Sequence, residues 1–307
     1  TFAFLKEQVT NGYFEGLITK YLLENLHGSL VIIRPKKGLT AEQDEQLRKK
    51  LAAYKESLTA EERKQIVSFT KHLKEYQSEP SPQEDLEKIP LLERGDIGKK
   101  ALPFQNEELS AGGVTLVHHD LFTNGIGYVN LIFRADRIPE ELIPYLGLLK
   151  AVLDKVDTEH YSYGEFAKEL NLHTGGIYCS VGSYDQVREP DRYQAVFEVH
   201  SKSLYEELPT AFSMMQEMLL TSKMDDAKRL REIVAEAKSR LQMSFQTSGH
   251  SMAALRAMSY FSESACFSDM TGGVDFYHFI EELDAGFEER QAEAAEKLSK
   301  LARLLFR

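Results

Sequence analysis

Three places in the chain carry residue types that could do chemistry, and the first is a pair of histidines. His118, His119 and Asp120 follow one another at the end of an apolar run, and all three types can bind a metal ion. Adjacent residues of a strand point to opposite faces, so the two imidazoles cannot easily share one ion. The pattern therefore favours an ordinary strand end over a metal centre.

The second place is a histidine followed by paired glycines. His173, Thr174, Gly175 and Gly176 lead into an apolar run, and these four residues are our candidates for contact with a bound peptide. No Lys-Ser or Lys-Thr follows the glycines, which excludes a phosphate-binding loop. Close approach of two backbones at a strand start explains the glycines, and a histidine that serves only the turn is the alternative interpretation of His173.

The third place is a pair of glutamates, Glu232 and Glu236, on a segment with helical periodicity over residues 225–247. The spacing from Glu236 to Arg240 suits an ion pair one helical turn apart. We interpret both glutamates as solvated or ion-paired. The chain contains no Gly-x-Ser-x-Gly sequence of the kind that presents a nucleophilic serine.

Composition narrows the class of protein. The chain has 307 residues and a formal net charge of −11, which argues against a nucleic-acid partner because phosphate binding needs a basic surface. No apolar run approaches the length of a membrane span, so we expect no membrane partner. The two cysteines, Cys179 and Cys266, match no metal pattern and no disulfide framework, and we expect buried free thiols in a reducing compartment.

The first hundred residues predict helices with little core. Residues 2–25 have helical periodicity and residues 30–33 suggest a short strand, which together look like the tail of an upstream domain over 1–38. The chain begins with Thr1, so we expect a processed chain or a piece of a longer one. Capping-box patterns at 40–43 and 59–62 predict a helical hairpin over 40–78. Three prolines then mark an extended linker, and we assign 39–100 to hairpin and linker.

From residue 101 onward the pattern is α+β. We expect strands at 113–119, 128–133, 177–181 and 193–200, with a loop at 185–191. We expect helices at 139–156, 163–170, 204–220, 225–247, 249–264 and 275–306. Strands followed by many helices predict an antiparallel sheet covered by helices on one face. The expected fold class is therefore α+β, preceded by a long helical hairpin.

The order and spacing of several short segments resemble one enzyme family, the pitrilysin/insulinase-type zinc metallopeptidases, in their presequence-protease branch. These segments lie at residues 25–35, 89–97, 123–126, 139–146, 161–163 and 174–177. The charged hairpin at 40–78 also resembles the linker between the two halves of that family. The resemblance covers nearly the whole chain.

The family resemblance implies four homologous α+β domains that form two halves closing around an unfolded peptide. A catalytic domain carries His-x-x-Glu-His on its first helix, with two zinc ligands and a general base. Here the corresponding positions read Tyr145, Leu146, Gly147, Leu148 and Leu149. Tyr145 is a poor zinc ligand, and Leu148 and Leu149 cannot bind metal at all. We therefore expect no catalytic residue and no metal ligand in this chain.

The resemblance predicts a non-catalytic part of a zinc-dependent metalloendopeptidase. Residues 101–307 would be a peptidase-like domain that forms chamber wall, the hairpin would be the hinge, and zinc would belong to the parent protein alone. The expected partners are the remaining domains of the parent and unfolded peptides, in a bacterial cytoplasm or, alternatively, an organellar matrix. Two other hypotheses stay open: a stand-alone interaction module, and a non-catalytic subunit that pairs with a separate catalytic chain.

Overall fold

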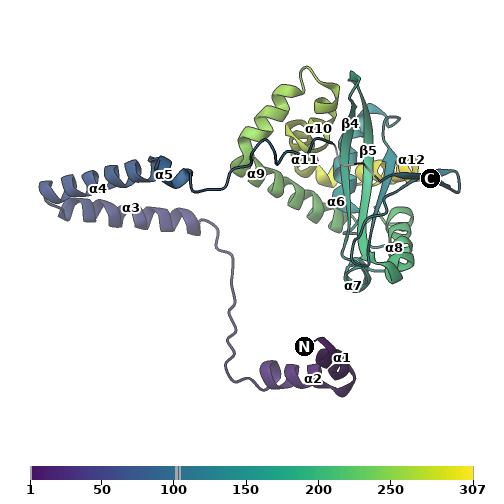
Figure 1. Cartoon of the computed structure of the whole chain (residues 1–307), viewed down its shortest axis with the longest axis horizontal. Coiled ribbons are helices and arrows are strands. Elements are labelled where there is room, and N and C mark those ends of the chain that lie inside the picture. Colours follow the sequence, from purple (N-terminus) through teal and green to yellow (C-terminus); the bar gives the residue numbers. More distant parts are fainter. Residues whose placement is uncertain (1, 101–102, 104, 307) are drawn as a thin grey trace. The chain divides into compact units, whose positions relative to one another are not determined.

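The computed structural model describes residues 2–100, 103 and 105–306, and the chain falls into two units divided between Leu102 and Pro103. The first unit is helical, with no sheet among its described residues. Its helices are α1 (Phe2–Gln8), α2 (Tyr13–Ile18), α3 (Leu39–Ser57), α4 (Ala60–Ser78) and α5 (Gln83–Leu86) (Figure 1). None of the residues in these five helices is buried.

The turn between α3 and α4 follows from local sequence. The Thr59 hydroxyl accepts from the Glu62 backbone N–H at 3.3 Å, and the Glu62 carboxylate accepts from the Thr59 backbone N–H at 2.8 Å. This capping box confirms the prediction at 59–62. The prediction at 40–43 was wrong, because Gly38 adopts a left-handed φ of 80° and α3 begins at Leu39, which places Thr40 inside the first turn.

Two predictions about the first unit were also wrong. The helix expected over 2–25 is interrupted at Gly12, whose φ is 68°, and it continues as α2 and a short π-helical turn (Thr19–Leu23). Residues 30–33 form no strand, and the side chains of Leu30 and Ile33 are exposed. A strand needs a hydrogen-bonding partner, and no described strand pairs with this segment.

The second unit is α+β, as expected. Its strands are β1 (Glu107–Ala111), β2 (Val114–His118), β3 (Ile126–Arg134), β4 (Ile177–Gln186) and β5 (Glu189–Leu204). Its helices are α6 (Ile143–Val152), α7 (Tyr163–His173), α8 (Leu208–Thr221), α9 (Ala227–Met258), α10 (Glu263–Gly272), α11 (Val274–Ala285) and α12 (Phe287–Phe306). Short 3₁₀ turns precede α6 (Glu140–Leu142) and α8 (Tyr205–Glu207).

Strands β3, β5 and β4 form an antiparallel sheet in that order, with β5 in the middle. Helices α6, α8, α10 and α12 pack against this sheet (Figure 1). Phe197 and Val199 of β5 are fully buried in the core, and they share their face with Phe133 of β3. The remaining face of the sheet carries the alternate residues, and we call it the open face.

Helix α6 lies at the centre of the core. Six of its ten residues are buried, and Gly147 lets α10 and α11 approach. A Cβ atom at Gly147 would lie 2.4 Å from the Thr271 carbonyl oxygen and 2.6 Å from the Phe276 ring. Helical periodicity alone predicts a buried stripe, whereas α6 is covered on nearly every side.

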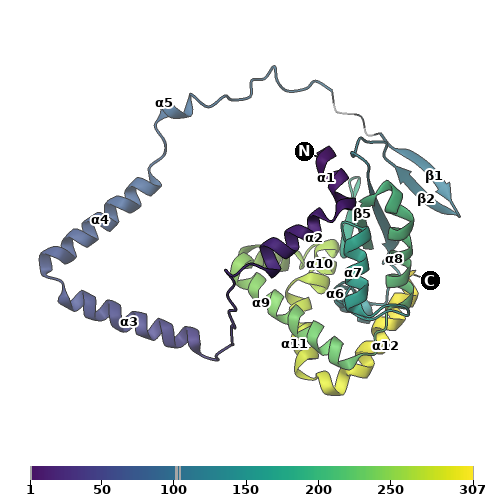
Figure 2. The ribbon, with the colours of Figure 1, turned by 90° about the horizontal axis from the view of Figure 1, so that it is seen from below.

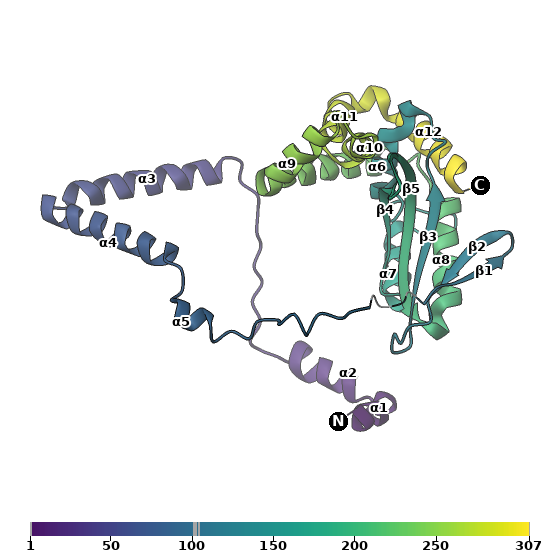
Figure 3. The same ribbon diagram turned by 45° about the horizontal axis from the view of Figure 1, so that its top comes forward.

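Several local features differ from the sequence-based expectation. The loop expected at 185–191 is shorter, because β4 and β5 extend to Gln186 and Glu189. Strand β1 was missed, and it pairs only with β2 in a ribbon that stands apart from the main sheet (Figures 2 and 3). Helix α9 runs through the break expected near residue 248, where Ser248 has non-helical angles of φ −135° and ψ 31°.

Candidate functional site

The three positions that correspond to zinc ligands and base in a catalytic domain form part of the core. Tyr145, Leu148 and Leu149 are 2%, 1% and 0% exposed. The Tyr145 ring packs edge-on against Phe279, with 4.8 Å between ring centroids, and the Lys297 ammonium lies 5.2 Å from the tyrosine ring. Burial raises the pKa of Tyr145. These side chains serve packing, and two of the three have no atom that could coordinate zinc.

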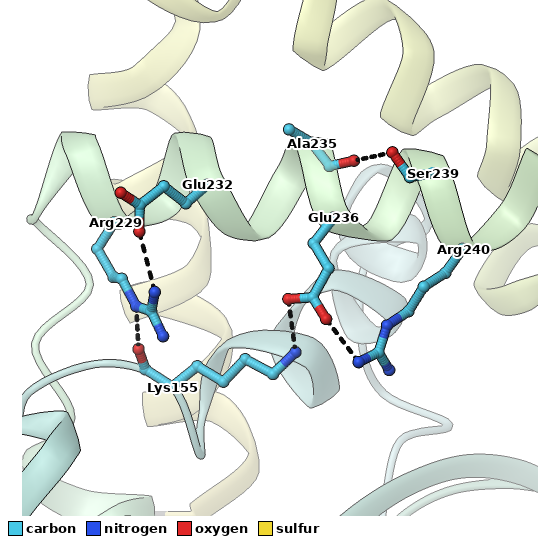
Figure 4. A network of polar contacts seen from close by, with 7 residues as sticks. All are labelled: Lys155, Arg229, Glu232, Ala235, Glu236, Ser239 and Arg240. Carbon is cyan, nitrogen blue, oxygen red and sulfur yellow. Dashed lines mark hydrogen bonds and ion pairs between the residues drawn. The ribbon is translucent and has the colours of Figure 1, made fainter. Parts of the chain in front are cut away.

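Glu232 and Glu236 both make ion pairs, as Figure 4 shows. The Glu236 carboxylate lies 3.0 Å from the Lys155 ammonium and 2.5 Å from the Arg240 guanidinium, which confirms the expected pair one turn apart. The hydrogen bond from Lys155 is the largest cause that lowers the pKa of Glu236. Glu232 pairs with Arg229 at 2.9 Å. The network ties α9 to the segment after α6.

The histidine before the paired glycines lies between two carboxylates. Nδ1 of His173 is 3.0 Å from Glu207, and Nε2 is 3.6 Å from Glu169. Because the two carboxylates face opposite nitrogens of one ring, they cannot join His173 around a single metal ion. The contacts join the end of α7 to the start of α8.

The paired glycines make the close approach expected of them. The Gly175 backbone N–H donates to the Lys202 carbonyl at 2.7 Å, and a Cβ at Gly175 would lie 2.7 Å from the lysine side chain. Gly176 has a φ of 110°, and its N–H donates to the Thr174 hydroxyl at 3.0 Å. These contacts bring the chain from α7 onto the middle strand.

The two adjacent histidines lie at the end of the β1–β2 ribbon. His118 is the last residue of β2, and its Nδ1 is 3.8 Å from the Glu107 carboxylate. His119 and Asp120 follow the strand and are exposed. Within residues 2–100, 103 and 105–306, no group of three or more His, Cys, Asp or Glu side chains is placed to hold a metal ion.

The two cysteines are free thiols, as expected, but each is only half-buried. Cys179 lies on β4, and burial raises the pKa of its thiol to about 12. Burial also raises the pKa of Cys266 on α10. A thiol must lose its proton to act as a nucleophile, so neither cysteine is activated for chemistry at neutral pH.

Sequence reasoning missed a polar cluster in the middle of the open face, formed by Asn130, Ser180, Tyr184, Glu198 and His200. Glu198 of β5 is only 9% exposed. Its Oε1 accepts hydrogen bonds from the Tyr184 hydroxyl at 2.5 Å and from the Asn130 amide at 3.4 Å. Its Oε2 accepts from the Ser180 hydroxyl at 3.2 Å. Burial raises the pKa of Glu198, but these hydrogen bonds outweigh it and the net pKa is lowered, so the carboxylate is ionised at neutral pH.

The cluster contains serine, histidine and glutamate, yet its geometry is not that of a nucleophilic triad. Ser180 Oγ lies 2.9 Å from His200 Nε2. Because the serine proton goes to Glu198, the serine oxygen is left to accept from the histidine. A nucleophilic serine needs the reverse, a histidine that takes the serine proton while the carboxylate holds its other nitrogen. Glu198 instead lies 3.7 Å from the same nitrogen, Nε2.

Large exposed side chains surround the cluster. Tyr128, Tyr178, Tyr184 and Ile132 all lie on the open face and are more than half exposed. The Tyr178 ring stacks on the His200 imidazole, with centroids 4.9 Å apart and planes 20° apart. The alternation of polar residues at 178, 180 and 184 is the only signal in the sequence, and it does not reveal which residues of β5 face them. The open face therefore combines an anionic centre with an aromatic rim, an arrangement suited to binding a peptide.

The comparisons with known proteins cover nearly the whole chain. The model of a peptidase-associated family, that of metallopeptidase family 16, subfamily C, matches residues 33–283. Protein HypA of Clostridium perfringens is 34% identical over 98% of this chain. Presequence protease 1, chloroplastic/mitochondrial, of Arabidopsis thaliana is 26% identical over 98% of the chain, and the mitochondrial presequence protease of Yarrowia lipolytica is 28% identical over 95%.

The matched relatives are much longer than this chain. The aligned region covers 31% of the Clostridium protein, 28% of the Arabidopsis protein and 29% of the Yarrowia protein. The chain thus spans about a third of the length of the curated relatives it matches. None of the described helices is both long and apolar enough to cross a membrane.

Proposed function

The chain belongs to the peptidase-associated family of metallopeptidase family 16, subfamily C, and from that membership we propose that it is a non-catalytic part of a zinc metalloendopeptidase. The observation that carries the proposal is helix α6. Its positions for two zinc ligands and a base hold Tyr145, Leu148 and Leu149, all within the core. Zinc and catalysis are then supplied by another part of the parent protein.

We propose that the open face of the β3–β5–β4 sheet forms part of the wall of a peptide chamber. Exposed tyrosines on a sheet face support this role, because their rings offer large contact area with few rotatable bonds. His173, Thr174, Gly175 and Gly176 support the wall by fixing the chain against Lys202 of the middle strand. In the same proposal residues 1–38 are the end of a preceding domain, and residues 39–100 connect the two halves as a hinge.

The partners in this proposal are the other domains of the peptidase and unfolded peptides. The compartment we propose is the bacterial cytoplasm, supported by the 34% identity to the Clostridium protein. The matches to mitochondrial and chloroplastic proteases support an organellar matrix as the alternative. A reading frame with His-x-x-Glu-His upstream of this chain supports the proposal, whereas a start codon directly before Thr1 favours a stand-alone module or separate subunit.

Metal and activity measurements on the purified chain test the non-catalytic assignment. After a chelator wash and exchange into buffer with zinc followed by gel filtration, we expect less than stoichiometric zinc on the protein. We also expect no cleavage of a quenched fluorescent peptide. Stoichiometric zinc that disappears on replacing His118, His119 or His173 would contradict the proposal, and so would turnover abolished by a point mutation in this chain.

Peptide binding tests the wall. A fluorescently labelled, unstructured peptide should bind the chain, and Tyr178→Ser should weaken binding because the tyrosine ring lies on the open face. Tyr260→Ser is the matched control, since Tyr260 is 75% exposed but belongs to the segment after α9. Equal loss of binding in both variants would contradict an assignment of the wall to the sheet.

A further inference from the structure

The Glu198 carboxylate is an almost buried charge without a lysine or arginine partner among the described residues. Its hydrogen bonds come from a phenol, an amide and a hydroxyl, which are neutral groups. Its nearest group that can carry a positive charge is His200, at 3.7 Å. Burying an ionised carboxylate is costly unless charge or hydrogen bonds compensate it. The charge is satisfied only in part by the protein itself.

One hydrogen-bonding position of the carboxylate remains open. An ionised carboxylate has about four acceptor positions, and Glu198 uses two on Oε1 and one on Oε2. The open position therefore belongs to Oε2, the oxygen nearest Ser180 and His200. The two other cations on this face are already engaged: Arg134 pairs with Asp136 at 2.8 Å, and the Lys202 side chain lies over Gly175.

The surroundings of the open position leave room for a ligand. Gly182 lies between Ser180 and Tyr184 on β4 and faces the same side, and a Cβ there would meet nothing within 4 Å. Tyr178 and Tyr184 flank this gap along the strand with exposed rings. A flat cation can stack on a tyrosine ring while it donates a hydrogen bond to a neighbouring carboxylate.

We propose that Glu198, Ser180, Tyr178 and Tyr184 form a subsite for the guanidinium group of an arginine in an extended peptide. One guanidinium N–H donates to Glu198 Oε2, and the plane of the group stacks on a tyrosine ring. The negative charge of the whole chain, −11, favours the approach of a basic peptide. The inference rests on the proposed peptide wall and adds to it a preference for one side chain.

The test compares two labelled peptides that differ in one group. One is a short threonine- and valine-rich peptide with a central arginine, and the other has citrulline there, which keeps the shape and removes the charge. On the full 307-residue chain, anisotropy titrations should give a Kd about tenfold lower for the arginine peptide. Added salt should reduce this difference, because it screens partly exposed charges.

Variants locate the preference. Glu198→Gln should bring the two Kd values together, and Tyr184→Phe should reduce the difference by withdrawing one hydrogen bond from the carboxylate. Glu189→Gln removes the same charge from the exposed start of the same strand, and it should leave the preference unchanged. Far-ultraviolet circular dichroism checks that each variant folds. The wild-type comparison of the two peptides stands even where a variant does not fold.

The outcomes separate this inference from the proposed wall. Equal Kd values for the arginine and citrulline peptides on the wild-type chain would overturn the subsite while leaving the wall in place. A preference that survives Glu198→Gln would also overturn the subsite. If neither peptide binds the wild-type chain, the wall proposal fails and the subsite fails with it.

Discussion

Helices α3 and α6 belong to one chain but are stable for different reasons. Helix α3 is rich in alanine, lysine, glutamate and glutamine, which are strong helix formers, and none of its residues is buried. Helix α6 contains Gly147, a poor helix former, and six of its ten residues are buried. Helix α6 depends on its neighbours, whereas α3 and α4 depend on their own residues. A segment can therefore be strongly helical and still weakly held in place.

The local contacts of the hairpin are worth little individually. Ion pairs one turn apart join Glu45 to Lys49 at 3.6 Å and Lys71 to Glu75 at 3.8 Å. Exposed pairs of this kind contribute about 0.3–0.5 kcal/mol each. A fully buried aliphatic side chain contributes about 1.5–3 kcal/mol, and α6 has several of them. The hairpin should therefore open far more readily than the core around α6.

Hydrogen exchange should show the difference most strongly. Amides between Leu47 and Leu73 should exchange about a thousandfold faster than those of β3, because weakly packed segments open at low free energy. Exchange followed by mass spectrometry on peptides from both regions measures the ratio. Equal protection would mean that the hairpin belongs to a packed core of the chain, and its assignment as a hinge between halves would be wrong.

Matched leucine substitutions should separate the two helices by several kcal/mol. Leu149 is fully buried, so Leu149→Ala should lower the free energy of unfolding by about 3–5 kcal/mol through a cavity. Leu51 in α3 is 57% exposed, and Leu51→Ala should change it by less than about 0.5 kcal/mol. Denaturant unfolding followed by near-ultraviolet circular dichroism reports on both. Similar losses in the two variants would remove the distinction between the helices.

A matched glycine pair tests close packing around α6. Gly147→Ala should cost about 2–3 kcal/mol, because its methyl group would meet the Thr271 carbonyl and the Phe276 ring. Gly164 in α7 has open space around it, and Gly164→Ala should stabilise the protein by about 0.5–1 kcal/mol. Thermal melts of the two variants give the signs. A gain in stability from Gly147→Ala would show that α6 is less tightly enclosed than the structure indicates.

The smallest effect is a pH dependence in the loop that follows α6. Burial raises the pKa of Glu217, but hydrogen bonds from Thr158 and His160 outweigh it and lower the pKa to about 2. The contribution of Glu217 to stability is therefore complete above its unfolded value near 4.5 and is lost as the pH falls toward 2. A hydrogen bond to Glu217 raises the pKa of His160, so the histidine contributes below 6.5 and loses its contribution as the pH rises through the raised value.

The variant Glu217→Gln isolates this contribution. The stability difference between wild type and variant should be largest between about pH 5 and 6, where the glutamate is ionised and the histidine is protonated. The difference should shrink on both sides of that range. Unfolding free energies measured across the acid range test the shape, and a difference that stays constant with pH would contradict the assigned pair.

Features that depend on neighbouring residues could be predicted from the sequence. The capping box at Thr59 and Glu62 and the ion pair between Glu236 and Arg240 each lie within four residues, so local chemistry determines them. The α+β class followed from periodicity, because several strands and helices carry long patterns. Residues 30–33 show the limit: their β-branched and apolar side chains favour a strand, but no described strand pairs with them.

The polar cluster could not be predicted because it depends on strand register. Ser180 and Glu198 are 18 residues apart, and Asn130 and Glu198 are 68 residues apart. They meet only because β5 pairs with β4 on one side and β3 on the other. A shift of one residue would turn Glu198 into the core and Phe197 to the open face. Single-residue patterns do not determine that pairing.

The buried residues of α6 also make the loss of the metal site difficult to reverse in evolution. Histidine at 145 and 149 with glutamate at 148 would place three polar side chains at positions that are 2%, 0% and 1% exposed. Each burial without partners costs about 1–3 kcal/mol, and a domain has only about 5–15 kcal/mol of stability. A lineage that regained the motif would need surrounding changes first, because each single step lowers stability before any catalysis returns.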